Sequence, residues 1–182
     1  MNPKSIFYFR LYFTGFVTLC IWMLLFWTHY HGGVPSHHIL QRADLPAMSN
    51  WWGGLLLPII TWTLLYLVQI RIKKQNVPKA ILDTFKKQIL FGFLWSLLFG
   101  VFLAVSFTLE IAMVLDNILY VLLILAFLLP IFHAECILGF ILGMTFTFGV
   151  IIPTAFALLV AFISSVIYKY IRPLALRLVK RT

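Results

Sequence analysis

Long apolar runs separated by short polar segments make up most of the chain. Three runs lie in the first part, and a nearly uninterrupted apolar stretch follows Glu110. A helix that crosses the hydrocarbon core of a bilayer needs about 20 mostly apolar residues. The last stretch therefore has room for three more spans, with Pro130 and Pro153 as the natural breaks. The pattern predicts six transmembrane helices, at 6–27, 51–72, 88–107, 111–132, 134–152 and 154–171.

The composition supports this interpretation. Of the 182 residues, 63% are hydrophobic and 10% are charged, and the mean hydropathy is +1.02. A soluble domain has about 45–50% apolar and about 25% charged residues. A soluble enzyme, a secreted disulfide-stabilised domain and a disordered chain are thereby excluded. The predicted fold class is all-α: a polytopic membrane helix bundle that forms a single integral membrane domain over residues 1–182.

The formal net charge of +9 follows from where the basic residues stand. With six spans and a cytoplasmic N-terminus, every one of the 14 basic residues except Arg42 falls on the cytoplasmic side. Lys and Arg accumulate in cytoplasmic loops and attract anionic membrane lipids. We therefore expect both termini in the cytoplasm and a location in the plasma (inner) membrane. Membrane lipids are the expected partners, and the charge gives no reason to invoke nucleic acid.

Small residues recur four apart in three of the predicted spans. Such residues let helix backbones approach closely inside a membrane. We expect these helices to form the tight centre of the bundle or to contact another subunit of a homo-oligomer or larger membrane complex. The fourth span has bulky side chains almost throughout and is expected to face lipid. The three sets are Gly92, Ser96, Gly100 and Ala104; Gly139, Gly143 and Thr147; and Ala157, Ala161 and Ser165.

The loop between the first two spans is unusually rich in histidine. It contains four of the five histidines, and Asp44 follows them. Imidazole and carboxylate groups are good ligands for a divalent transition metal such as zinc. The sequence therefore indicates a metal site with these ligands, although the spacing of the ligands matches no established signature. The proposed metal ligands are His29, His31, His37 and His38.

Two acidic residues near the start of the fourth span form a second group of candidates. Asp116 lies inside the predicted span, and Glu110 directly precedes it. An ionisable group below the membrane interface is costly and is therefore a functional candidate. Together with Asp44 they are the proposed catalytic residues. The alternative is that Asp116 simply ends the apolar span at headgroup depth.

His133 and Glu135 stand between the fourth and fifth spans, at the opposite membrane face in this topology. Such a pair could relay a proton or line the mouth of a pore. The alternative is an ordinary interfacial turn after Pro130.

These candidates support different functions. The predicted function is an integral membrane protein whose extracytoplasmic His/Asp-rich site assists the metal-dependent hydrolysis or modification of a lipid. An ion or proton channel or transporter, possibly oligomeric, is one alternative. A non-catalytic subunit of a larger membrane complex is the other. The sequence contains no GxSxG, Walker A or GxGxxG motif, so nucleotide hydrolysis and cofactor-dependent redox chemistry have no support.

The topology itself makes a testable prediction. A reporter fused to the C-terminus should be cytoplasmic, and one inserted into the loop between the first two spans should be extracytoplasmic, because an even number of spans brings both termini to one side. An extracytoplasmic C-terminus would contradict the six-span arrangement.

Overall fold

Six helices account for nearly all of the computed structural model, which describes residues 3–32, 36–38, 47–74 and 79–179. The sixth helix continues through a π-helical turn, η2 (Ile167–Ile171), into α7 (Arg172–Val179). Two short strands, β1 (Ser36–His38) and β2 (Ala47–Ser49), pair antiparallel with His37 opposite Met48. The predicted all-α helix bundle is confirmed. The helices are α1 (Pro3–Tyr30), α2 (Trp51–Lys74), α3 (Lys79–Thr108), α4 (Ala112–Leu128), α5 (Ala134–Phe148) and α6 (Ile151–Val166).

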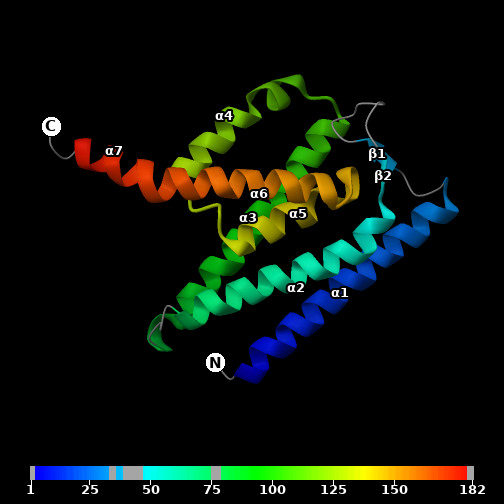
Figure 1. The fold of residues 1–182 in the computed structure, drawn as a ribbon, viewed down its shortest axis with the longest axis horizontal. Helices are drawn as coiled ribbons and strands as arrows, with labels where there is room; N and C mark the ends of the chain where they lie inside the picture. Colours follow the sequence, from blue (N-terminus) through cyan, green and yellow to red (C-terminus); the bar gives the residue numbers. More distant parts are fainter. Residues whose placement is uncertain (1–2, 33–35, 39–46, 75–78, 180–182) are drawn as a thin grey trace.

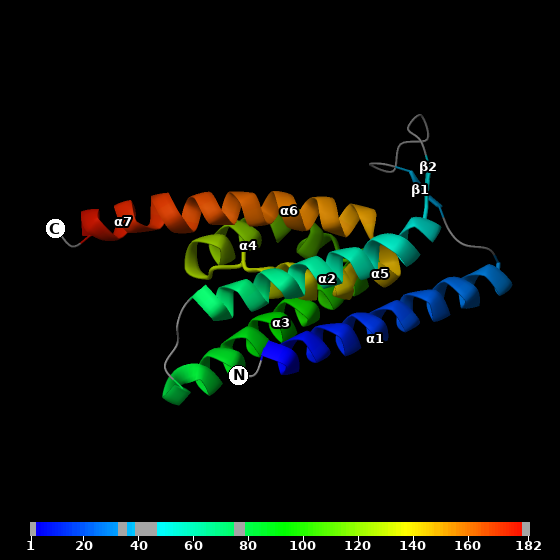
Figure 2. The ribbon, with the colours of Figure 1, turned by 60° about the horizontal axis from the view of Figure 1, so that its bottom comes forward.

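Successive helices run in alternating directions, so the bundle has two chemically different ends (Figures 1 and 2). At one end α2 ends, α3 and α5 begin and α6 continues into η2. We call it the basic end, because the described lysines and arginines lie there. At the other end α1 ends and α2 begins, and we call it the histidine end. The basic residues with described side chains are Arg10, Arg71, Lys73, Lys74, Lys86, Lys87, Lys169, Arg172 and Arg177.

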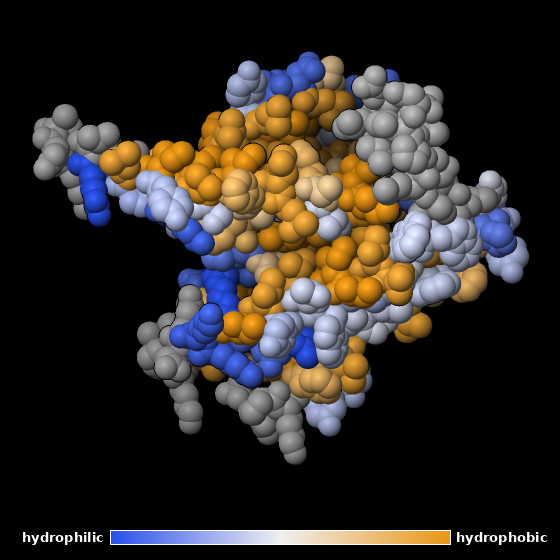
Figure 3. Space-filling view, in the orientation of Figure 1, coloured by the Kyte–Doolittle hydropathy of each residue, from blue (hydrophilic) through white to orange (hydrophobic). Residues whose placement is uncertain are grey.

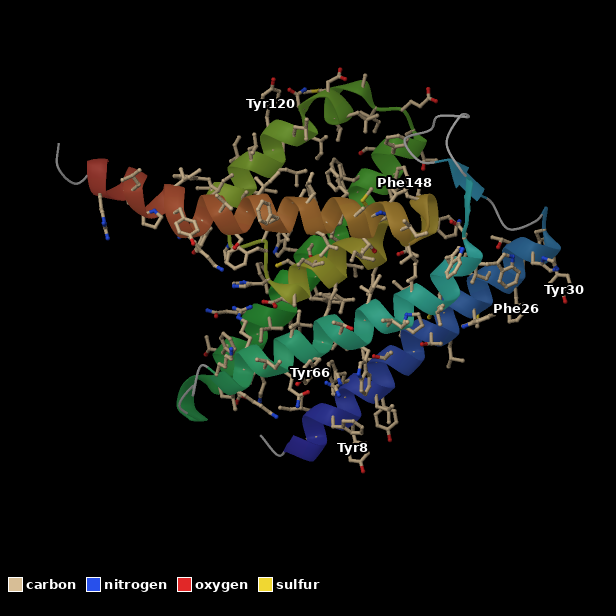
Figure 4. All side chains as sticks on the ribbon, in the orientation of Figure 1. Tyr8, Phe26, Tyr30, Tyr66, Tyr120 and Phe148 are labelled. Atoms are coloured by element: carbon tan, nitrogen blue, oxygen red, sulfur yellow. The ribbon has the colours of Figure 1, made fainter. Side chains whose placement is uncertain are left out.

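Aromatic side chains mark both ends of the α1–α2 pair. Tyr8 and Tyr66 lie toward the basic end, whereas Phe26 and Tyr30 lie toward the histidine end (Figure 4). Aromatic residues are enriched at both interfaces of membrane proteins, because their rings suit the headgroup region. Their placement fits a bundle that crosses a bilayer.

Four helices are long and apolar enough to cross a membrane: Ser5–Tyr30, Trp51–Lys74, Leu82–Thr108 and Ile151–Leu174. The other two are shorter. At 1.5 Å per residue, the 17 residues of α4 and the 15 residues of α5 extend about 26 and 22 Å, less than a hydrocarbon core of about 30 Å.

Two of the predicted boundaries need correction. The helix in the region 111–132 ends at Leu128 and not at 132, because Leu129 precedes Pro130 and is extended. The helix in the region 134–152 ends at Phe148 and not at 152, because Gly149 adopts a φ of 68°. The break before α6 therefore lies at Gly149. Pro153 falls inside the first turn of α6, where a missing N–H is tolerated.

The closest helix contact joins α3 to α5. A Cβ atom at Gly100 would lie 2.8 Å from the carbonyl oxygen of Phe140, and one at Gly143 would lie 2.5 Å from that of Leu97. A Cβ at Gly139 would clash with Ser96 and with the backbone of α3. The two backbones thus touch at positions where only glycine fits, and the predicted tight centre is confirmed for these two helices.

The remaining helices surround this central pair. Helix α5 also contacts α2 and α6, and α2 contacts α1. Ala157 is buried in α6, in agreement with its predicted packing role. Helix α4 packs on α6 and exposes Leu119, Tyr120 and Ile124, as predicted for a lipid-facing span.

The glycine contact predicts a position-specific loss of stability. Gly143→Ala should lower the free energy of unfolding by roughly 1–3 kcal/mol, because backbone on α3 cannot make room for the methyl group. Gly15→Ala is the matched control, since a Cβ there meets nothing within 4 Å. That change should be neutral or stabilise by up to about 1 kcal/mol through helix propensity. Unfolding in mixed micelles measures both, and equal effects would contradict this packing.

Candidate functional site at the basic end

A partly buried ion pair links α2 to α5 at the basic end. Nη1 of Arg71, in the last turn of α2, donates a short hydrogen bond to Oε1 of Glu135, in the first turn of α5. Glu135 is only 5% exposed. The Arg71 guanidinium also lies 5.3 Å from the ring centre of Phe85 on α3. One cation therefore joins three helices around a single carboxylate.

The two oxygens of the Glu135 carboxylate have different surroundings. The N-terminus of α5 and Arg71 both place positive charge beside Oε1. Gly92 of α3 faces the side chain, since a Cβ there would lie in ordinary contact distance, 3.5 Å, from Cγ of Glu135. The second oxygen, Oε2, is buried and has no hydrogen-bond partner among the described residues. Oε2 is therefore a hydrogen-bond acceptor to which no described residue donates.

His133 completes this centre. It precedes α5 as its N-cap, and its Nδ1 lies 3.8 Å from Oε1 of Glu135. Burial lowers the pKa of His133, and the charge of Arg71 lowers it further, while Glu135 acts in the opposite direction. The imidazole is therefore neutral near pH 7 and can accept a proton. We call Arg71, His133 and Glu135 the ion-pair centre.

A second buried cation lies nearby, between α1 and α2. Arg10 is 8% exposed, and its guanidinium carbon lies 3.8 Å from the ring centre of Trp62. Nη1 donates a hydrogen bond of 3.2 Å to Oε1 of Gln69, and the ring of Tyr66 lies 5.2 Å away. The aromatic faces and the amide stabilise the charge and attach α1 to α2.

The histidines with described side chains are engaged with aromatic rings. The ring of His29 lies 5.8 Å from that of Trp51. The ring of His31 stacks on Trp27 at 3.9 Å, and its Nδ1 lies 2.9 Å from the carbonyl oxygen of Trp27. Both residues are exposed at the end of α1. These contacts are those of interfacial histidines at a helix terminus.

The two acidic candidates at the histidine end, Glu110 and Asp116, belong to different elements. Glu110 is exposed in the turn between α3 and α4, with a φ of 51°. Asp116 is exposed on α4, beyond its first turn. Among the described residues, no three His, Cys, Asp or Glu side chains are close enough together to hold a metal ion. The side chains of His37 and His38, and all of Asp44, lie outside the described residues, so the metal site stays a prediction.

A cavity of about 210 Å³ opens at the histidine end. It lies between α1, α2 and α5, and its lining is mainly apolar. Three polar side chains, Thr28, Asn50 and Thr145, contribute to its wall. Gly149 packs directly against the Asn50 amide and holds the end of α5 against the start of α2.

Sequence reasoning found His133 and Glu135 but missed Arg71 as their partner. Arg71 stands in a strongly basic segment, which the charge distribution explained as cytoplasmic loop. It lies 64 positions from Glu135, and nothing in a single sequence distinguishes it from the lysines that follow. The one available signal was that Glu135 is an isolated acid within an apolar stretch and therefore requires a cation.

Comparison with known protein families, with curated proteins and with solved structures found no match to this chain.

The ion pair predicts an asymmetric effect on stability. Arg71→Ala should lower the free energy of unfolding by roughly 3–5 kcal/mol, because it leaves a buried carboxylate unpaired. Adding Glu135→Gln to this variant should recover part of the loss. The exposed pair of Lys86 and Asp83, 2.8 Å apart, is the control, and Lys86→Ala should cost at most about 1 kcal/mol. Equal losses at the two pairs, measured by unfolding in micelles, would contradict this assignment.

Proposed function

We propose that this chain is a membrane transport protein and that protons are the species it moves. Glu135 and His133 are the proton-binding groups, and Arg71 holds Glu135 in place. The observation that carries the proposal is the buried carboxylate at the start of a short central helix, with one oxygen on a cation and the other without a hydrogen-bond partner in the described part of the chain.

The position of this centre fits a path across the bundle. Gly53, in the wall of the cavity, and Arg71, in the ion pair, lie on the same helix about 27 Å apart along its axis. That separation is close to the thickness of a hydrocarbon core. In the proposed path, the polar groups of the basic end therefore lie on one side of the membrane interior, and the cavity of the histidine end lies on the other.

Three buried hydroxyl groups lie within the bundle, and that of Ser106 stands in the last turn of α3. The hydroxyls of Thr61 on α2, Ser106 on α3 and Ser164 on α6 are buried and have no hydrogen-bond partner among the described residues. A hydroxyl left without a partner in an apolar interior costs free energy, and a water molecule is the usual partner. These side chains therefore supply hydration sites at three heights in the bundle, which a proton path requires.

The short helix α5 provides a further argument. In transporters, binding sites often form where spanning helices are short or broken, since helix termini then lie at membrane depth. Helix α5 is central, spans less than the hydrocarbon core and begins at the ion-pair centre. Its end at Gly149 borders the cavity.

Transport is favoured over the metal-assisted hydrolysis of a lipid for one reason. A proton path needs a buried acid that can exchange a proton, and Glu135 is such a residue. The described histidines and acids of the histidine end are exposed and do not form a cluster. Three expectations from the sequence stay predictions: hydrolysis of a lipid with a divalent metal such as zinc, assembly into a homo-oligomer, and a role as a non-catalytic subunit. Metal analysis of the purified full chain tests the first of them.

The decisive experiment measures proton influx into proteoliposomes with a pH-sensitive dye, driven by a potassium gradient and valinomycin. Wild-type vesicles should acidify faster than protein-free vesicles. Glu135→Gln should reduce the protein-dependent rate at least about tenfold, because it removes a proton-transfer group and keeps its shape. Asp83→Asn, in the exposed pair, should leave the rate unchanged. Wild-type vesicles no faster than empty ones, or a folded Glu135→Gln protein at full rate, would overturn the proposal.

A second pair of variants tests the interior path. Thr61→Val removes a buried hydroxyl and keeps the side-chain volume, so the proton rate should fall severalfold, as expected when a water site loses its partner. Thr63→Val is the matched control on the same helix, since the Thr63 hydroxyl is exposed and donates to the carbonyl oxygen of Ile59. Equal rates for the two variants would show that the path does not pass Thr61.

A further inference from the structure

Two cations and two aromatic rings form a second feature of the basic end, beside the ion-pair centre. The rings of Phe132 and Tyr168 lie 5.9 Å apart. Nζ of Lys169 lies 5.1 Å from the ring centre of Phe132, and the guanidinium carbon of Arg172 lies 4.4 Å from that of Tyr168. We call these four residues the aromatic–cation platform.

The backbone at the platform departs from a regular helix. Tyr168 and Lys169 lie in the π-helical turn η2, and Arg172 follows it directly. Short π-helical segments are rare and are frequently found at functional sites. Phe132 comes from the segment between α4 and α5, so the platform joins two parts of the chain that the fold brings together.

The charge of the platform is not neutralised by the fold. Arg71 is paired with Glu135, but neither Lys169 nor Arg172 has a carboxylate within ion-pair distance among the described residues. The aromatic rings orient the two cations and leave their charge intact. Two positive charges in fixed positions favour an anion, and phosphate is a preferred partner of Lys and Arg.

The surface around the platform is apolar. Tyr170, Ile171 and Leu174 expose large side chains next to the cations. In Figure 3 the hydrophilic surface gathers mainly at the basic end, whereas the helices beyond it present a mostly hydrophobic surface. A ligand that satisfies both surfaces carries a phosphate at one end and hydrocarbon at the other, as an anionic phospholipid does.

We propose that the aromatic–cation platform binds the phosphate headgroup of an anionic phospholipid, whose acyl chains lie along the exposed apolar faces beside it. This inference does not depend on proton transport, since it uses Lys169 and Arg172 and not the ion-pair centre.

Native mass spectrometry of the detergent-solubilised full chain tests the proposal with two lipids of equal acyl chains, phosphatidylglycerol and phosphatidylcholine. The wild-type protein should retain phosphatidylglycerol preferentially. Lys169→Ala with Arg172→Ala should weaken that retention by roughly fivefold for each cation removed. The charge-conserving pair Lys169→Arg and Arg172→Lys should keep most of it.

The control removes the same charge from the same end. Lys73→Ala with Lys74→Ala changes two exposed lysines outside the platform and should alter retention less than twofold. Equal losses in the two double variants would overturn the proposal, because they would indicate a general charge effect. A wild-type protein without preference for phosphatidylglycerol would overturn it too, as would inorganic phosphate that displaces the lipid at equal concentration.

Discussion

The backbone contact between α3 and α5 is the constraint on which the rest of the structure depends. In lipid, apolar side chains gain little by leaving one hydrocarbon environment for another, so close packing must hold the helices together. The glycines at 100, 139 and 143 bring the two backbones into direct contact. That contact places the short helix α5 at the centre, where it also touches α2 and α6.

The central position of α5 decides the chemistry at the basic end. Helix α5 begins at the basic end, and its first turn carries Glu135. A carboxylate buried there needs a compensating charge, which the last turn of α2 provides through Arg71. The pair therefore joins α2 to α5 and, in the proposed function, also positions a proton acceptor. One carboxylate oxygen contacts Arg71, and the other has no hydrogen-bond partner among the described residues.

The basic end has two parts with different charge, the ion-pair centre and the aromatic–cation platform. Around Glu135, positive and negative charge balance, which suits a group that exchanges protons. Around Phe132 and Tyr168, two cations have no carboxylate partner among the described residues, which suits an anion bound from outside. His133 lies between the two parts, and its ring is 4.7 Å from that of Phe132. An anion bound at the platform would favour the protonated imidazole, so the two sites are placed to influence each other electrostatically.

The sequence by itself determined the class of fold, the approximate position of all six helices and the separation of basic from acidic and histidine-rich ends. These follow from local properties: the length of apolar runs, the distribution of lysine and arginine, and glycines spaced four apart. It also singled out His133 and Glu135. Only the tertiary structure decided that Arg71 pairs with Glu135, that Lys169 lies on the ring of Phe132, and that α5 ends at Gly149. Those features depend on contacts between residues far apart in the chain and on a glycine with a left-handed backbone conformation. The periodicity of a single helix does not reveal either of them.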